Sequence, residues 1–236
     1  MEFVTDRGVF SRNRVDPGTR LLAEAFEPDG DGRVLDAGCA YGALGIAVAA
    51  RFPQLRVVMV DINERAVELC RINIRRNGVA NACCLVGDGL CALAPGSLAA
   101  VLTNPPVRAG RAVLYRWFEE ARGRLITGGS LWVVIRTRQG AHSLMRWLEG
   151  RYAAVRVVAR EGGYRVLRAQ NFPGPPPGPG RSSSAAAEPF TGGDGRAGAG
   201  RTQSSRRVTL WCSKWPFGAD DGCQARFAST APRMPR

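Results

Sequence analysis

Long apolar runs are absent from this chain of 236 residues. No stretch reaches about eighteen consecutive apolar residues, the length that a membrane-spanning helix needs. The charged-then-apolar leader of a secreted protein is missing as well. The sequence therefore predicts neither a transmembrane helix nor a signal peptide, and we expect a cytoplasmic protein that does not contact a membrane.

Histidine is also scarce, and the cysteines are not spaced as the ligands of a metal site usually are. The only histidine, His142, has no evident partner for acid–base chemistry. The seven cysteines do not follow the spacing of a metal site, since Cys83 and Cys84 are adjacent and the others are scattered. We expect buried, reduced thiols, no bound metal and no catalytic role for Cys39, because its loop needs a small side chain.

Lysine is nearly absent, yet the formal net charge is +13. Arginine supplies almost all of the charge, because Lys214 is the single lysine. Residues 1–170 hold 24 basic and 16 acidic side chains, a net +8, and the remainder holds 9 and 4, a net +5. A basic surface favours a phosphate backbone, and arginine also stacks on unpaired bases. The composition indicates a nucleic-acid partner, although a solvated helix face explains Arg71, Arg75 and Arg76 equally well.

Strand-like and helix-like segments alternate over residues 1–170, after a short N-terminal hairpin. Strands are expected at 33–36, 56–61, 82–86, 98–103, 130–135, 155–160 and 164–169, and helices at 19–26, 43–52, 64–77, 112–125 and 143–152. Such alternation predicts parallel pairing in a doubly wound α/β sheet. A glycine break at Gly128-Gly129 precedes the fifth strand, and a glycine turn at Gly162-Gly163 joins the last two strands as a hairpin.

The composition changes near Asn171. Residues 171–200 contain six prolines and eight glycines, and serine and alanine fill much of the rest. Such a segment buries too little apolar surface to offset its chain entropy. We expect one domain over residues 1–170 and a disordered, low-complexity tail over residues 171–236.

Three carboxylates stand at the ends of three consecutive predicted strands. Asp36, Asp61 and Asp88 would converge on one crevice, because ligands of open α/β sheets collect at the carboxyl ends of the strands. Gly38 and Gly42 allow a tight strand-to-helix turn whose backbone can approach a ligand. Asp36 suits an ammonium group, and Asp61 lies at the offset of a ribose-binding acid. Helix capping or turn formation is the alternative for each acid taken alone.

An Asn-Pro-Pro turn follows the fourth predicted strand. The side-chain oxygen of Asn104 and the carbonyl of Pro105 offer two acceptors, and proline has no N–H to compete with them. Two acceptors can hold both hydrogens of an exocyclic amino group and align its lone pair with an electrophilic methyl. A plain strand terminator is the alternative when the turn is considered alone.

With these motifs the chain resembles the class I S-adenosylmethionine-dependent methyltransferases. It is most similar to the methyltransferase small domain group, which includes bacterial rRNA guanine-N2 methyltransferases of both ribosomal subunits. The matching segments are Gly8–Ser11, Asp16–Leu22, Val60–Ala66, Asn104–Arg111, Gln139–Ala141 and Gly163–Val166. The resemblance spans about residues 3–169 and implies a Rossmann-like, seven-stranded sheet, mostly parallel with an antiparallel last strand.

The resemblance also implies roles for individual residues. The loop from Asp36 to Gly42 would hold the methionine part of S-adenosylmethionine, Asp61 its ribose and Asp88 the adenine amino group, with Ile62 and Gly89 as cofactor-binding neighbours. The expected catalytic residues are Asn104, Pro105 and Pro106, and the expected substrate-binding residues are Val107, Arg108 and Arg111.

Two positions depart from the family pattern. The middle glycine of the loop is Ala40 here, which adds a methyl group where backbone and cofactor approach closely, and we expect reduced affinity. Val107 stands where enzymes acting on adenine or glutamine carry an aromatic residue, and by resemblance a branched aliphatic suits the guanine-N2 branch.

The sequence thus predicts an N-methyltransferase that acts on guanine N2 of rRNA, with rRNA or a ribosomal subunit as partner and a monomeric or homodimeric state. Methylation of adenine or of a protein glutamine is the first alternative. The second is a catalytically silent cofactor-binding or RNA-binding remnant, suggested by Ala40 and by the single copy of the domain.

Overall fold

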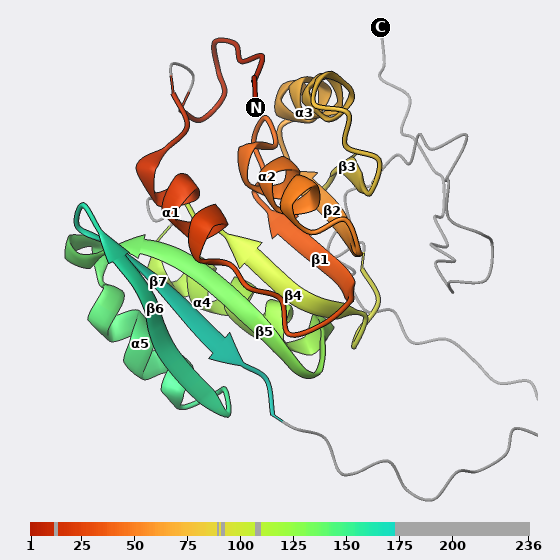
Figure 1. Cartoon of the computed structure of the whole chain (residues 1–236). Coiled ribbons are helices and arrows are strands. Elements are labelled where there is room, and N and C mark those ends of the chain that lie inside the picture. Colours follow the sequence, from red (N-terminus) through yellow and green to blue (C-terminus); the bar gives the residue numbers. More distant parts are fainter. Residues whose placement is uncertain (12–13, 89, 91–92, 107–109, 173–236) are drawn as a thin grey trace, which may run out of the picture.

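The computed structural model describes residues 1–11, 14–88, 90, 93–106 and 110–172 (Figure 1). The expected tail from residue 173 onward lies outside the described residues. The strands are β1 (Gly32–Ala37), β2 (Leu55–Asp61), β3 (Ala82–Val86), β4 (Leu98–Thr103), β5 (Leu125–Arg136), β6 (Ala154–Glu161) and β7 (Tyr164–Gln170). The helices are α1 (Pro17–Ala25), α2 (Ala43–Arg51), α3 (Glu64–Arg76), α4 (Arg111–Arg124) and α5 (Ala141–Glu149), with a short 3₁₀ turn, η2 (Thr137–Gln139).

The seven strands form one sheet in the order β3-β2-β1-β4-β5-β7-β6. All neighbouring pairs from β3 to β5 are parallel, whereas β7 runs antiparallel to both β5 and β6. Gly162 and Gly163 both have positive φ, at 53° and 80°, as a tight hairpin turn between right-twisted strands requires. The predicted doubly wound sheet with an antiparallel last strand is confirmed.

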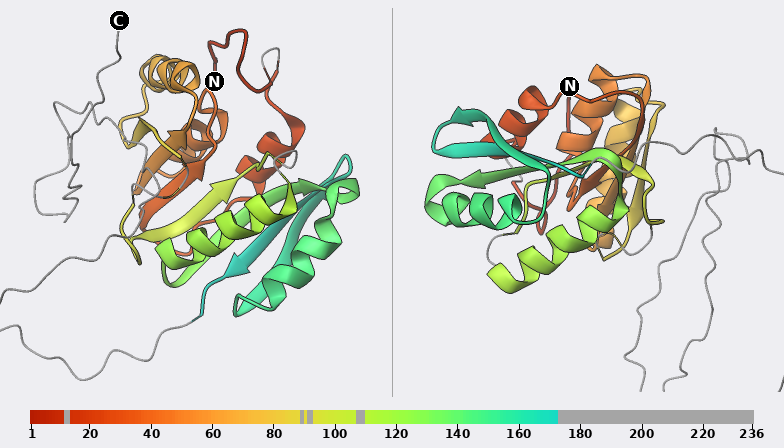
Figure 2. Two further views of the ribbon diagram at one scale, coloured as in Figure 1. Left: turned by 180° about the vertical axis from the view of Figure 1, so that it is seen from behind. Right: turned by 90° about the horizontal axis from the view of Figure 1, so that it is seen from below.

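Helices cover both faces of the sheet, as the two views of Figure 2 show. One apolar core joins α1, α2 and α3 to strand residues such as Val34 and Met59, and the other joins α4 and α5 to their neighbours Leu35 and Val58. Successive residues of a strand point to opposite faces, so a strand buried on both faces is apolar at nearly every position. This explains why the strand cores could be found as continuous apolar runs.

The N-terminal hairpin expected from the sequence is wrong for the part of the segment that the structure describes. Residues 1–6 form no strand and run along α3 instead. The buried side chain of Asn73 accepts a hydrogen bond from the Val4 amide at 2.7 Å and donates one to the Val4 carbonyl at 2.9 Å. One side-chain amide therefore supplies the backbone partners that a second strand would have supplied.

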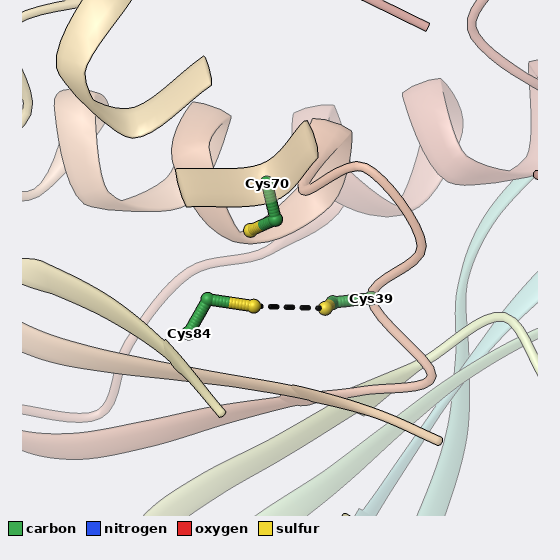
Figure 3. A group of neighbouring side chains, drawn as sticks. All are labelled: Cys39, Cys70 and Cys84. Atoms are coloured by element: carbon green, nitrogen blue, oxygen red, sulfur yellow. Dashed lines mark hydrogen bonds between the residues drawn. The ribbon is translucent and has the colours of Figure 1, made fainter. Parts of the chain in front are cut away.

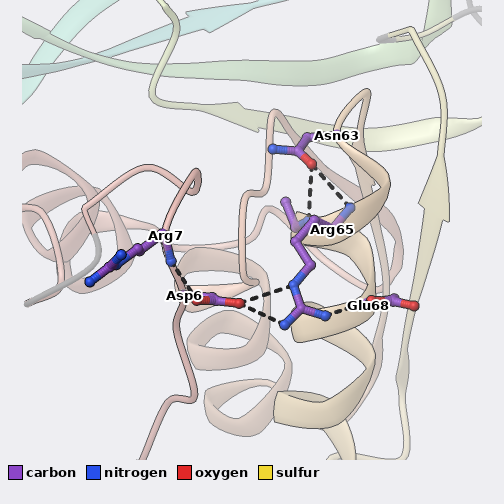
Figure 4. A network of polar contacts seen from close by, with 6 residues as sticks. Asp6, Arg7, Asn63, Arg65 and Glu68 are labelled. Atoms are coloured by element: carbon purple, nitrogen blue, oxygen red, sulfur yellow. Dashed lines mark hydrogen bonds and ion pairs between the residues drawn. The ribbon is translucent and has the colours of Figure 1, made fainter.

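Charged contacts fasten the same segment to the start of α3 (Figure 4). The Arg65 guanidinium lies between Asp6, at 2.6 Å, and Glu68, at 2.9 Å. The Asn63 side chain accepts from the Arg65 amide at 3.0 Å and so caps the N-terminus of α3. These exposed ion pairs contribute little stability individually, and together they orient the segment on the helix.

The expected glycine break before the fifth strand is also wrong, because Gly128 and Gly129 lie inside β5. The pairing of β4 with β5 shifts register here, between Leu98 and Ala100. A Cβ on Gly129 would lie 2.9 Å from the Ala99 carbonyl oxygen, so glycine permits the close approach of the two strands. Among the described residues, no helix combines the length and apolarity needed to cross a membrane.

Candidate cofactor and catalytic site

The loop between β1 and α2, Gly38 to Gly42, folds over the end of β2. The amides of Gly38 and Cys39 both donate to the Val60 carbonyl, at 2.9 and 3.0 Å. Gly38 and Gly42 have φ values of 76° and 91°, which glycine adopts without steric cost. The predicted tight turn is present, and its backbone faces the carboxyl ends of the strands.

Ala40 has a left-handed backbone conformation, with φ of 48°. This conformation costs an L-residue with a Cβ about 1–2 kcal/mol relative to glycine. We expected the extra methyl of Ala40 to act through steric contact with a cofactor. The structure adds a cost in the free protein, namely backbone strain in the loop.

Asp61 holds the loop in this conformation. Its Oδ2 accepts a hydrogen bond from the Ala40 amide at 2.8 Å, and its Oδ1 accepts from the Asn63 amide at 2.9 Å. A carboxylate has about four lone-pair sites, so both oxygens keep capacity for a ligand hydroxyl. The sequence suggested ligand binding for Asp61, with capping or turn formation as the alternative, and the structure shows that its carboxylate positions the loop.

Asp36 is almost fully buried at the end of β1, with 1% of its surface exposed. Desolvation raises the pKa of its carboxyl group to about 8, against a hydrogen bond from the Gly45 amide at 2.8 Å that favours the charged form. A Cβ on Gly45 would lie 3.0 Å from the Asp36 Oδ2 and 2.5 Å from the Met59 sulfur. Gly45 thus permits the burial of Asp36, a role that sequence reasoning missed.

The Asn104 amide is anchored by α1. Its Nδ2 donates to the Asp16 carboxylate and to the Thr19 hydroxyl, both at 2.9 Å. An ionised carboxylate only accepts hydrogen bonds, so the amide nitrogen must face Asp16. The Asn104 Oδ1 is therefore left as an acceptor, as the predicted clamp for an amino group requires.

Asp16 joins three parts of the chain at this point. Besides Asn104, its carboxylate accepts from the Thr19 amide at 3.0 Å, as the N-cap of α1, and from the Tyr164 hydroxyl at 3.3 Å. Gly18 makes room for the aromatic ring, because a Cβ there would lie 2.7 Å from Tyr164. Sequence reasoning assigned Asp16 no role in the site. The Asp-Pro pair before a helix signals a cap, but nothing local signals its contact with Asn104.

A pocket brings the β1–α2 loop together with Asn104, which directly follows β4 and is called the Asn104 tip below. Four predicted site residues line it: Asp36, Gly38, Ala40 and Asn104. The other lining residues were not predicted as site residues, and they are Phe10, Ser11, Asp16, Thr19, Cys39, Tyr41, Ala43 and Leu44. The pocket therefore joins β1, β4 and the segment around the start of α1.

Three further predicted cofactor residues, Asp61, Ile62 and Asp88, lie outside this pocket but near the same sheet edge. Asp61 pairs with Val86 in the β2–β3 register, and the Gly87 amide donates to the Asp61 carbonyl at 3.0 Å. Asp88 is exposed, and Ile62 exposes 66% of its surface directly after β2. An exposed large apolar side chain beside the loop is suited to contact a flat ligand.

Of the remaining predicted catalytic and substrate-binding residues, Pro105 is buried, Pro106 is exposed, and Arg111 is exposed as the first residue of α4. Gly89, Val107 and Arg108 lie outside the described residues. Burial raises the pKa of the Cys39 thiol well above its usual range, which opposes a nucleophilic role, as expected.

The order of the sheet, the glycine loop after β1 and the acid at the end of β2 define the fold of class I S-adenosylmethionine-dependent methyltransferases. Within that class, the chain belongs to the methyltransferase small domain family, whose profile matches residues 1–168.

Its relatives include an uncharacterised Bacillus subtilis protein called YbxB, which is 41% identical over 170 residues, covering 71% of this chain and 85% of the relative. The ribosomal RNA large subunit methyltransferase G of Streptomyces avermitilis is 38% identical, covering 69% of this chain and 43% of the relative. The small subunit methyltransferase C of Pseudomonas entomophila is 34% identical, with 72% and 51% covered. The chain thus spans about half the length of the rRNA methyltransferases that it matches.

A similar solved structure is that of a 16S rRNA N2 methyltransferase from T. thermophilus in complex with AdoMet and guanosine. It has a TM-score of 0.60 and 30% identity, and the match covers 70% of this chain and 45% of that one.

Proposed function

We propose that the protein is an S-adenosylmethionine-dependent N-methyltransferase that acts on an exocyclic amino group, namely guanine N2 of rRNA. The observation that carries this proposal is the fixed orientation of the Asn104 amide. Its nitrogen is committed to Asp16 and Thr19, at 2.9 Å each, so its oxygen is available as an acceptor in the pocket that the β1–α2 loop also lines.

The residues around the loop fit the proposed cofactor. Asp36 is a buried acid with a raised pKa, and a cationic ammonium group would favour its charged form. Asp61 has spare acceptor capacity for ribose hydroxyls, Ile62 offers an apolar surface to the adenine ring, and Asp88 offers an acceptor to the adenine amino group. When bound, the cofactor supplies an electrophilic methyl group on a sulfonium.

Catalysis in this proposal depends on positioning. The Asn104 Oδ1 and the Pro105 carbonyl accept the two hydrogens of the target amino group, which aligns the nitrogen lone pair with the methyl carbon. The C–N bond forms as the sulfonium C–S bond breaks, and the proton of the product leaves to water. A neutral amine attacking a sulfonium requires no strong general base.

The choice of rRNA guanine rests on similarity and charge. The two rRNA methyltransferases named above are 38% and 34% identical to this chain over the aligned residues. A net charge of +8 over residues 1–170 favours a phosphate backbone. The target base must be single-stranded or flipped out of its helix to reach Asn104.

We further propose that residues 1–170 form the functional unit, and that the protein acts where ribosomes assemble, in the cytoplasm. A chain ending at residue 172 should then bind the cofactor as tightly as the full chain does. Sedimentation of the full chain distinguishes a monomer from a homodimer.

The test is methyl transfer from tritiated S-adenosylmethionine to naked rRNA, to purified ribosomal subunits and to a release factor. Label should appear at guanine N2 of rRNA, and Asn104→Ala should abolish transfer while cofactor affinity by calorimetry changes less than threefold. Asn171→Ala serves as the matched control, because that side chain donates to the Ile126 carbonyl at the start of β5, the end of this strand that is far from Asn104.

Label in protein alone would contradict the substrate assignment. A protein that binds neither S-adenosylmethionine nor its demethylated product would be a silent remnant, and the proposal would fail.

A further inference from the structure

Three cysteine side chains that are scattered in the sequence meet inside the protein. Cys39 comes from the β1–α2 loop, Cys70 from α3 and Cys84 from β3. Their sulfur atoms all lie within 4.8 Å of one another, and each residue is at most 6% exposed. Figure 3 shows Cys39 and Cys84 pointing toward each other, with the sulfur of Cys70 close to both.

The spacing of the sulfur atoms fits a shared metal ion better than a disulfide. Points no more than 4.8 Å apart have a centre at most about 2.8 Å away (4.8 Å divided by the square root of three), and zinc–sulfur bonds measure about 2.3 Å. Tetrahedral zinc with such bonds sets its ligands about 3.8 Å apart, and the Cys39 and Cys84 sulfurs are 3.7 Å apart. A disulfide would require about 2.05 Å.

A positive charge lies beside the cluster, because the Arg71 guanidinium donates a hydrogen bond to the Cys84 carbonyl at 3.3 Å. Three thiolates around a divalent ion carry one net negative charge, which Arg71 offsets, so the buried cluster is close to neutral.

We propose that Cys39, Cys70 and Cys84 bind one thiophilic divalent metal ion, zinc, with water as the fourth ligand. Three metal–sulfur bonds form, and each S–H bond that breaks releases its proton to solvent. The described residues supply no fourth cysteine or histidine to this cluster. Packing of neutral thiols in the core is the alternative that the experiment must exclude.

Such an ion would join the β1–α2 loop to α3 and β3. A Cβ on Gly42 would lie 2.6 Å from the Cys70 sulfur, so the loop already packs directly on the cluster. The metal would have no part in the methyl transfer. It would instead reduce the motion of the loop whose backbone lines the pocket, and this role holds whatever the substrate of the protein is.

The experiment titrates cobalt(II), as a spectroscopic substitute for zinc, into the full-length, reduced and chelator-stripped protein. Three further cysteines, Cys91, Cys212 and Cys223, lie outside the described residues and are replaced by serine in every protein compared. The test variants are Cys70→Ser and Cys84→Ser.

Cys83→Ser is the matched control. Cys83 is the neighbour of Cys84 on β3, and it packs with the core on the opposite face of the sheet. Its replacement changes the same strand and the same residue type without touching the cluster.

The parent and Cys83→Ser proteins should bind one cobalt per chain, with strong near-ultraviolet thiolate absorption and the visible bands of a tetrahedral site, and zinc should displace the cobalt. Cys70→Ser and Cys84→Ser should bind at least 100-fold more weakly. The affinity of the parent should fall as the pH is lowered, because protons compete for the thiolates. Equal binding by parent and cluster variants, or absorption without thiolate bands, would overturn the proposal.

A second measurement covers the case in which a cluster variant fails to fold. Zinc added to the folded parent should protect three of its four remaining thiols from a thiol-modifying reagent and raise its melting temperature. Protection of fewer than three thiols, or protection without any change in melting temperature, would also overturn it.

Discussion

The two sides of the pocket are held in different ways. The β1–α2 loop is held by its neighbours in the sheet, through the Val60 carbonyl and the Asp61 carboxylate at the end of β2. The Asn104 tip is held by side chains from both ends of the domain, chiefly Asp16 and Thr19 of α1. The conformation of the loop is therefore fixed by the strand that lies next to β1. The position of the Asn104 tip depends on a few long-range hydrogen bonds, so single substitutions should disturb it more.

Among substitutions that leave Asn104 itself in place, Asp16→Ala should have the largest effect. Without the carboxylate, the Asn104 amide loses one of its two anchors and α1 loses its N-cap. Misplacement of a positioning group by about 1 Å can cost roughly 100-fold in rate, so we expect a kcat about 100-fold lower. The cofactor dissociation constant should change less than threefold, because the loop contacts remain.

Asp16→Asn tests the positioning role of Asp16 directly. Its oxygen can still cap α1 and accept from Asn104, so most of the lost kcat should return. A dissociation constant that rises in parallel with the loss of kcat would instead place Asp16 on the cofactor side of the pocket.

The contrast between loop and tip also explains what could be predicted from the sequence. Strands β3 and β4 were predicted with the observed bounds, because a strand covered on both faces is a continuous apolar run. Where such a strand ends is also clear from the sequence, so the glycines and acids that follow β1 and β2 could be assigned to the β1–α2 loop and its surroundings. Two partners of Asp16, Asn104 and Tyr164, are 88 and 148 residues away, and no periodic pattern links such distant positions.

The N-terminal segment and the cysteines also make contacts between distant residues that no local pattern in the sequence predicts. A hairpin was expected near the N-terminus, but the side chain of Asn73 replaces the second strand. The meeting of Cys39, Cys70 and Cys84 follows only from the sheet order and the position of α3. The ends of strands can be predicted from the sequence, whereas contacts between helices, strands and loops can be identified only once the fold is known.

Asp36→Asn tests the acid on the loop side. The folded pKa of Asp36, about 8, lies above the usual 3.8. Its contribution to stability is complete below about pH 4 and is lost as the pH rises toward 8. Asp36→Asn should therefore gain stability relative to the parent between pH 4 and pH 8, as measured by denaturant unfolding at several pH values.

Cofactor affinity should respond to the same substitution in the opposite sense. In the parent, affinity should rise with pH up to about 8, because the charged carboxylate binds the ammonium group. In Asp36→Asn it should be about 10- to 100-fold lower at pH 8 and nearly independent of pH, as one lost charged hydrogen bond of about 1.5–3 kcal/mol implies. A parent whose affinity does not vary with pH would contradict the ligand role of Asp36.

Ala40→Gly tests the strain in the loop. It removes about 1–2 kcal/mol of left-handed strain and adds about 0.5–1 kcal/mol of unfolded-state entropy, so we expect a net gain of roughly 0.5–1 kcal/mol in unfolding free energy. Cofactor affinity should rise a few-fold with the removal of the methyl group. Ala47→Gly, in the middle of α2, is the matched control and should lose about 1 kcal/mol. Equal losses in both variants would show that Ala40 is not strained.

Tyr164→Phe should have the smallest effect, although it acts on the more sensitive side of the pocket. The hydroxyl of Tyr164 lies 3.3 Å from Asp16, a long hydrogen bond, and the aromatic ring that packs over Gly18 is kept. Asp16 also keeps its bonds to Thr19 and Asn104, so its position is still defined from two directions. We expect a decrease in kcat of about twofold, consistent with a net loss below about 1 kcal/mol, and an unchanged cofactor dissociation constant. A decrease beyond tenfold, with the fold intact by circular dichroism, would mean that the antiparallel strand β7 positions Asn104 as strongly as α1 does.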